Sequence, residues 1–159
     1  MTSIHEALDE YRMMIGGAST EAISGRTYTS VDPYTGQPWA RVPDAGREDV
    51  DAAVAAAGRA LEGPWGALTA TQRGKLVPRL GDLLAREAQR LADLETRDNG
   101  KLLREMAGQM AILPEWYYYF GGLADKHQGS VIPTDKANYL VYTRHEPVGV
   151  VAAIVPWNS

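Results

Sequence analysis

The chain has no cysteine among its 159 residues, and this absence removes several kinds of chemistry at once. Without thiols, these residues cannot form disulfides, thiolate metal sites or a cysteine nucleophile. Charge of one sign is not concentrated either: 16 Lys and Arg stand against 20 Asp and Glu, and no long run of like charge occurs. The balanced charge, with a formal net value of −4, argues against nucleic acid as a partner.

Long apolar stretches are also absent. The longest, Val150 to Pro156, falls far short of the ~20 residues that a membrane-spanning helix needs. Met1 to Arg12 mixes acidic residues with few apolar ones, so it has neither the basic flank nor the apolar block of a signal peptide. We therefore expect no membrane partner and a cytoplasmic location.

Common cofactor and metal signatures are missing as well. No G-x-G-x-x-G, phosphate-loop or G-x-S-x-G pattern occurs. The three histidines, His5, His127 and His145, are far apart along the chain and include no i, i+4 pair. Because a metal site requires several converging ligands, we expect none in these residues.

What is present is typical of a globular protein, with 45% hydrophobic and 23% charged residues. Residues 13–43 predict short strands. Arg26–Val31 is rich in β-prone residues, Asp32–Gly36 supplies Pro and Gly for a tight turn, and Gln37–Val42 is the expected return strand. Apolar side chains in strands usually face a core, so we expect packing roles for Tyr28, Val31 and Trp39.

From Gly46 the apolar residues recur at helical spacing. Val50, Val54, Ala57 and Leu61 form one face of a helix that should end at Gly63-Pro64. Residues 69–72 have the form of a capping box, which predicts a second helix that stops near Asn99-Gly100.

A third helix should begin near Leu103. Pro114 predicts a kink or a restart within it. The aromatic run 116–120 cannot all face one side of a helix, so we expect some of its rings in the core and others over a neighbouring element.

Beyond Gly129 the pattern is that of strands. Residues 129–147 predict a β-hairpin, which is barely stable alone and needs a surface to lie on. Val148–Val155 is almost wholly apolar, as expected of a parallel strand buried on both faces. Such a strand needs neighbours reached by crossover helices. We therefore expect an N-terminal portion of a larger α/β protein with an incomplete sheet.

Four blocks of this sequence, in order, resemble the aldehyde dehydrogenase superfamily over nearly all of 13–158. Asp32–Gly36 is similar to the N-P-A-T-G turn of that family, and two departures are Leu102 after Gly-Lys and Ser159 after Trp-Asn. The other blocks are Leu94–Lys101, Gly122–Lys126, and Tyr142–Val150 continuing into Ile154–Asn158.

The resemblance implies four parts. An N-terminal segment covers 1–12, and the strands and helices of a Rossmann-type cofactor domain cover 13–128. Residues 129–147 are then an oligomerisation arm that joins a dimer or tetramer. Residues 148–159 are the first parallel strand of the cofactor sheet and the start of the active-site turn.

The resemblance also implies site residues. Asn158 matches an asparagine whose amide helps bind the oxyanion formed by thiolate attack on the aldehyde. The residues lining the nicotinamide side of an NAD or NADP site would be Ile154, Val155, Pro156 and Trp157. They would follow the carboxyl end of a parallel strand, where open α/β sheets bind ligands.

The implied parent reaction is oxidation of an aldehyde to a carboxylic acid through a cysteine thiohemiacetal, with hydride passed to NAD(P)+ and a base-assisted hydrolysis. The nucleophilic Cys and general-base Glu of that family lie beyond the residues matched here, so we expect the chain alone to be inactive. The alternative is a non-catalytic short product that acts as an oligomerisation or interaction module through 129–147.

Overall fold

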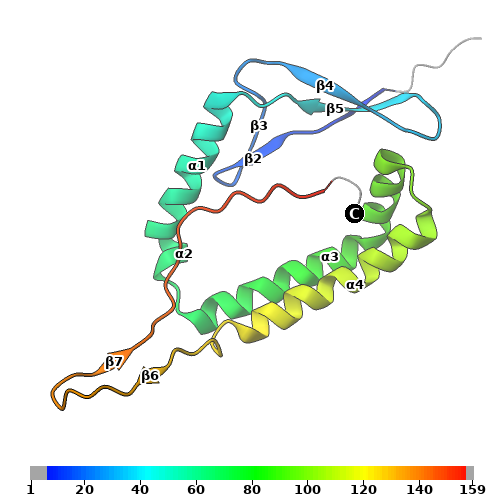
Figure 1. The fold of residues 1–159 in the computed structure, drawn as a ribbon. Coiled ribbons are helices and arrows are strands. Elements are labelled where there is room, and N and C mark those ends of the chain that lie inside the picture. Colours follow the sequence, from blue (N-terminus) through cyan, green and yellow to red (C-terminus); the bar gives the residue numbers. More distant parts are fainter. Residues whose placement is uncertain (1–6, 157–159) are drawn as a thin grey trace, which may run out of the picture.

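The structure, a computed structural model, describes residues 7–156 and contains strands first, then helices, then a hairpin (Figure 1). The small sheets lie on one side of the molecule, α1 and α2 connect them to the antiparallel pair α3 and α4, and the hairpin β6–β7 points away from the rest. In chain order the elements are β1 Asp9–Glu10, β2 Met13–Ile15, β3 Ala18–Thr20, β4 Thr27–Val31, β5 Pro38–Pro43, α1 Arg47–Glu62, α2 Pro64–Ala67, α3 Ala70–Asn99, α4 Leu103–Leu123, β6 Val131–Ile132 and β7 Val141–Tyr142.

The main sheet has the order β1-β5-β4, in which β4 and β5 are antiparallel and β1 is parallel to β5. This confirms the predicted pair of strands around the turn at 32–36. The Asp32 carboxylate accepts hydrogen bonds from the backbone N–H groups of Tyr34 at 2.8 Å and Thr35 at 3.3 Å. Desolvation is the largest single influence and acts to raise the pKa of Asp32. The two backbone hydrogen bonds, a further one from the Thr35 side chain and the positive charge of Arg97 together outweigh it, so the pKa lies below its ordinary value.

The core between this sheet and α3 centres on β5. Trp39 is 6% exposed, and its ring lies edge-on to Tyr11 at 5.8 Å and under the guanidinium of Arg97 at 5.1 Å. The packing prediction is thus right for Trp39 and wrong for Tyr28 and Val31, which are 56% and 47% exposed. Both lie on β4, one of the two edge strands of the sheet.

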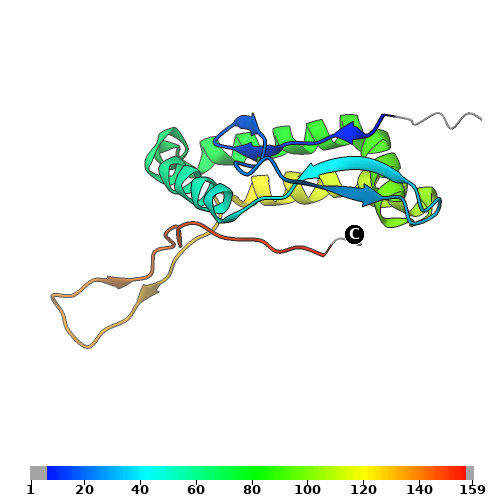
Figure 2. The same ribbon diagram turned by 90° about the horizontal axis from the view of Figure 1, so that it is seen from above.

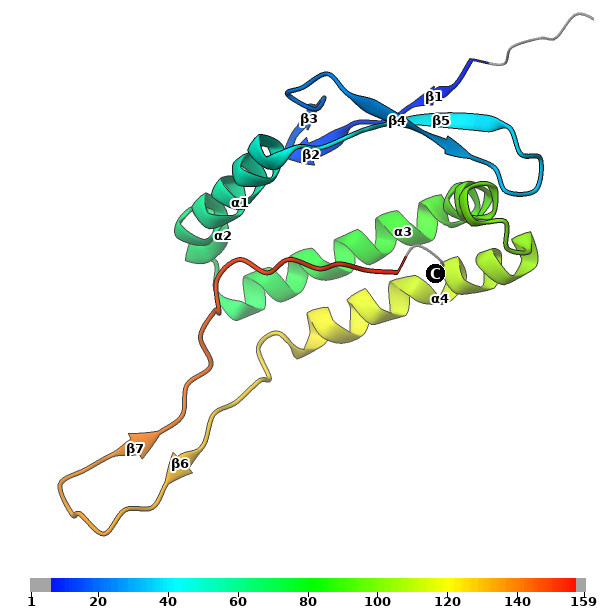
Figure 3. The same cartoon turned by 45° about the horizontal axis from the view of Figure 1, so that its top comes forward.

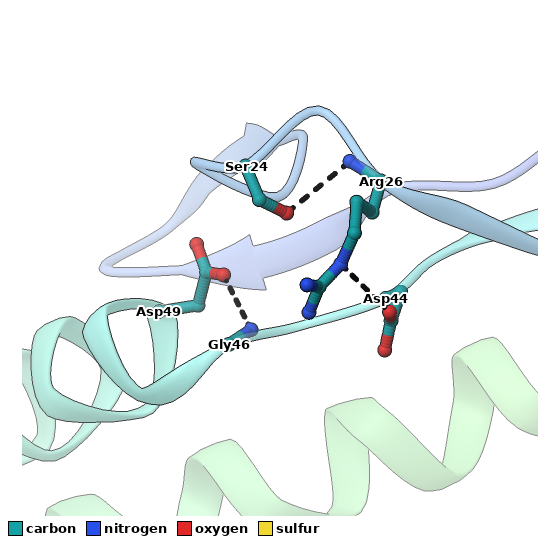
Figure 4. Close-up of polar contacts among 5 residues, drawn as sticks. All are labelled: Ser24, Arg26, Asp44, Gly46 and Asp49. Carbon is teal, nitrogen blue, oxygen red and sulfur yellow. Dashed lines mark hydrogen bonds and ion pairs between the residues drawn. The ribbon is translucent and has the colours of Figure 1, made fainter.

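Helix α1 begins where the periodicity predicts, and its start is fixed by a buried carboxylate. Asp49 is 3% exposed and accepts hydrogen bonds from the backbone N–H groups of Gly46 at 2.8 Å and Ile23 at 3.0 Å. It therefore caps the helix and also holds the turn that precedes β4. Figure 4 shows this contact beside the ion pair of Arg26 and Asp44, whose atoms are 3.1 Å apart.

Helices α3 and α4 run side by side in opposite directions (Figure 3). The predicted capping box is confirmed, since Thr69 and Gln72 exchange side-chain and backbone hydrogen bonds. Gly100 ends α3 in the left-handed conformation with φ +75°. Helix α4 continues unbroken through Pro114, so the helix does not restart there.

Glycines let α3 and α4 approach each other closely. A Cβ placed on Gly121 would lie 2.6 Å from Cδ of Pro78, well inside van der Waals contact. A Cβ on Gly74 would lie 2.7 Å from the carbonyl oxygen of Gly121. Glycine is therefore the residue that fits at this crossing.

A second close approach joins the turn between β4 and β5 to the end of α3. A Cβ on Gly100 would lie 2.7 Å from Cγ of Pro33. Gly100 thus satisfies two requirements at once, its positive φ and the contact with this proline.

Candidate functional site

The segment predicted to carry the site follows the hairpin as extended chain. Residues 147–156 form no helix and pair with no strand among residues 7–156. Figure 2 shows the hairpin and this segment lying to one side of the layer that the main sheet and the helices form. The prediction that 148–155 is a buried parallel strand stays a prediction, because no described strand lies beside it to supply hydrogen bonds.

The predicted cofactor-lining residues divide between described and undescribed positions. Ile154 and Val155 are 99% and 76% exposed, and Pro156 is exposed too. Trp157 and Asn158 lie outside the described residues. The three described residues of this set thus lie open to solvent.

These residues do not fit a dinucleotide by themselves. Ile154, Val155 and Pro156 contribute apolar side chains only, and a nicotinamide site also needs polar groups that fix the orientation of its ligand. The side chains of Ile154, Val155 and Pro156 instead form exposed apolar surface.

Uncovered apolar surface is also extensive on the helices. On α1, Val50 is 54% and Val54 is 50% exposed, so the predicted apolar face exists but nothing described covers it. On α4 the exposed rings are those of Trp116, Tyr119 and Phe120. The expected covering of a neighbouring element is not seen for these three, which remain more than half exposed and form ring contacts with one another. Surfaces of this kind are typical of interfaces.

Tyr118 belongs to the same aromatic run but faces α3. Its hydroxyl donates a hydrogen bond to Asp82 at 3.0 Å. This hydrogen bond is the main reason that the pKa of Tyr118 lies above its ordinary value, with desolvation and the negative charge of Asp82 adding to it. The contact joins the two helices and supplies no reactive group.

One pocket lies between the main sheet and the helix pair. Its volume is about 400 Å³, and its lining includes Trp39, Val42, Leu91, Leu94 and Met110. The indole N–H of Trp39 and one carboxylate oxygen of Glu95, which also lines it, are buried without a hydrogen-bond partner. The lining is mostly apolar. Its polar groups include Ser30, whose hydroxyl donates a hydrogen bond to Asp98 at 2.6 Å, and no group in it matches the thiolate chemistry that the resemblance implies.

The base of the hairpin brings two histidines together that the sequence separates. The ring centres of His127 and His145 are 4.0 Å apart and the ring planes are tilted by 47°. Sequence spacing did not reveal this pair, because it arises from the pairing of the two hairpin strands. Within residues 7–156 no group of three or more metal-binding side chains occurs.

The lengths and hydropathies of the described helices show whether any of them could span a membrane. Among residues 7–156, no helix is both long enough and apolar enough to cross a bilayer.

Comparison with known proteins identifies the chain's relatives. The profile of the aldehyde dehydrogenase family matches residues 20–159. The chain is 46% identical over 153 residues to the (Z)-2-((N-methylformamido)methylene)-5-hydroxybutyrolactone dehydrogenase of Acinetobacter baylyi, covering 96% of this chain and 31% of that protein. It is 42% identical over 141 residues to the mitochondrial aldehyde dehydrogenase of Homo sapiens, covering 87% of this chain and 27% of that protein.

Solved structures agree with these matches. The aldehyde dehydrogenase of Bacillus cereus, solved as an NAD+ complex, superimposes with a TM-score of 0.84 at 40% identity, covering 88% of this chain and 29% of that chain. The chain thus spans about 30% of the length of the relatives it matches.

Proposed function

The chain belongs to the aldehyde dehydrogenase family, and from this premise we propose that it forms the N-terminal part of an NAD(P)-dependent enzyme that oxidises an aldehyde to a carboxylic acid. The family match over residues 20–159 carries this proposal. Since the 159 residues contain no cysteine, the thiolate that forms the thiohemiacetal must come from residues outside them. The chain alone is therefore catalytically inactive.

Asn158 is the residue of this chain that we assign to the chemistry. Its side-chain amide would donate a hydrogen bond to the oxyanion that develops when a thiolate attacks the aldehyde carbon. A neutral donor stabilises the developing negative charge without forming a competing ion pair, and loss of one such donor typically costs ~10²–10³ in rate.

The proposed reaction requires a dinucleotide cofactor. NAD or NADP would accept the hydride, and Ile154, Val155, Pro156 and Trp157 would line the nicotinamide side. Because the described residues do not fit the dinucleotide by themselves, we derive no step through it.

The hairpin arm supports the proposed assembly into a homo-oligomer. Its side chains are exposed, with Leu140 at 75% and Tyr142 at 60%, and a ribbon with open edges requires a covering surface. The same observation supports the alternative function, a non-catalytic interaction module. The cytoplasmic location stays a prediction, since relatives of this chain include mitochondrial proteins.

Two experiments test the proposal. The reading frame downstream of residue 159 should continue into a segment with a cysteine and a glutamate, whereas a native stop codon and a specific complex of the short chain would favour the interaction module. In the full-length enzyme, Asn158→Ala should lower kcat about 10²–10³-fold in an NAD(P)H absorbance assay.

The matched control is Gln37→Ala, which removes an exposed side-chain amide from the loop between β4 and β5 and should leave kcat unchanged. Equal rates for the Asn158→Ala variant and the unmodified enzyme would contradict the assigned role. NADH formation by the purified 159-residue chain would contradict the proposed inactivity of that chain.

A further inference from the structure

The His127–His145 pair joins the two strands of the hairpin at its base. His127 follows the end of α4 and His145 follows β7, and the two rings are in contact with centres 4.0 Å apart. Both side chains are exposed to solvent. An exposed pair of imidazoles is accessible to an ion from solution.

The backbone beside the pair is held in a fixed register. Thr143 donates its N–H to the carbonyl of Ser130 at 2.9 Å, and the N–H of Ser130 donates to the hydroxyl of Thr143 at 2.8 Å. A Cβ on Gly129 would collide with the carbonyl of Thr143, so glycine lets the strands approach here. These contacts lie next to the histidines and set the separation of the two rings.

The charged side chains next to the histidines are engaged with each other. Lys126 pairs with Asp125 at 2.6 Å, and Arg144 pairs with Glu146 at 3.3 Å. Asp125 also accepts a hydrogen bond from Thr71 at 3.0 Å. The neighbouring cations are thus balanced by carboxylates, and the two imidazoles are the nitrogen donors at this position.

We propose that His127 and His145 bind a late first-row divalent metal ion such as Zn²⁺ across the base of the hairpin arm. Imidazole nitrogen suits zinc, copper and nickel. Two nitrogens on one tetrahedral zinc ion at about 2.1 Å lie about 3.4 Å apart. The two exposed rings, whose centres are 4.0 Å apart, reach this arrangement by swinging slightly apart through rotation about their side-chain bonds. Water completes the coordination, because no third protein ligand is grouped with the pair among residues 7–156.

The bound ion would cross-link the two strands of the arm at the point where they leave the rest of the molecule. The proposal does not rest on the proposed catalysis, since neither histidine lies in the segment that carries Asn158.

Isothermal titration of the untagged 159-residue chain with ZnCl₂ at pH 7.5 tests the proposal. We expect one Zn²⁺ per chain and no binding of Mg²⁺, which prefers oxygen ligands. His127→Asn and His145→Asn should each weaken Zn²⁺ binding by at least about tenfold, the lower end of what the loss of even an outer partner costs. Far-UV circular dichroism confirms that these exposed substitutions leave the fold intact.

The third histidine provides the matched control. His5→Asn should leave Zn²⁺ affinity unchanged, and NMR should show Zn²⁺-induced shifts at the imidazoles of His127 and His145. The proposal is overturned if neither hairpin variant weakens binding, if His5→Asn weakens it equally, or if the unmodified chain does not bind Zn²⁺.

Discussion

Replacement of Gly121 by alanine tests whether the close approach of α3 and α4 is as tight as the structure shows. Gly121 is buried on the face of α4 that contacts α3. A Cβ at this position would lie 2.6 Å from Cδ of Pro78 and 3.1 Å from the carbonyl oxygen of Gly74. Neither a proline ring in a helix nor a helical carbonyl can turn aside as a flexible side chain would.

Two opposing effects determine the magnitude. Alanine is favoured over glycine inside a helix by about 1 kcal/mol. Forcing extra volume into a packed contact typically costs about 1–3 kcal/mol. The Gly121→Ala variant should therefore have a free energy of unfolding between about equal to that of the unmodified chain and about 2 kcal/mol lower.

The adjacent glycine isolates the steric effect. Gly122 lies in the same helix, and a Cβ there would meet nothing within 4 Å. Gly122→Ala should benefit from the higher helix propensity of alanine without a steric overlap, so it should raise the free energy of unfolding by about 1 kcal/mol. The difference between the two variants, about 1–3 kcal/mol, is then the cost of the overlap.

Urea unfolding, followed by circular dichroism at 222 nm, measures the free energy of unfolding of both variants under identical conditions. With a slope of about 1–3 kcal/mol per molar urea, the expected difference between the variants shifts the midpoint measurably. If Gly121→Ala is as stable as Gly122→Ala, the helices are farther apart than the structure indicates and the reasoning fails.

Two further predictions concern carboxylates. Asp49→Ala should lower the free energy of unfolding by about 1–3 kcal/mol, because two backbone N–H groups lose their acceptor. Asp51→Ala, on the exposed side of the same helix, should change it by less than about 1 kcal/mol. Equal effects of the two variants in urea unfolding would contradict the role of Asp49. Hydrogen bonds from Lys126 and Thr71 lower the pKa of Asp125 below 3.8, so their contribution to stability is present above that pH and is lost as the pH falls through the lowered pKa. Thr71→Val should raise this pKa in an NMR carboxyl titration, and an unchanged value would count against the contact.

Local signals predicted the helices and the β4–β5 hairpin well. The capping box at 69–72, the stop at Gly100 and the turn at 32–36 are all set by nearby residues, and each appears where the sequence places it. The helical start after Gly46 is of the same kind, although the second partner of Asp49, the N–H of Ile23, is a contact that sequence spacing does not reveal.

Burial was predicted less well than secondary structure. Apolar periodicity identifies the face of a helix that prefers to be covered, but it does not say whether the cover lies within the same residues. Val50 and Val54 show the difference, because they follow the predicted stripe and are still about half exposed. The same holds for Ile154 and Val155, whose predicted strand has no described partner.

The candidate site depended on recognition of sequence blocks more than on physical patterning. Asn158 in isolation is an ordinary loop residue, and only its place after Pro156-Trp157 suggests an oxyanion donor. Conversely, the His127–His145 contact follows from hairpin register, which links residues 18 positions apart and carries no local signature.

The contact between Pro33 and Gly100 has a consequence for how this chain can vary. The turn between β4 and β5 and the C-terminal end of α3 are in close contact at Pro33 and Gly100, which are 67 positions apart in the sequence. Mutational tolerance at the two positions must then be correlated: a bulkier residue at 100 becomes acceptable only alongside a smaller one at 33, and only if it also accepts a left-handed backbone. A combinatorial library that randomises both positions together would reveal this dependence as epistasis, whereas scanning either position singly would miss it.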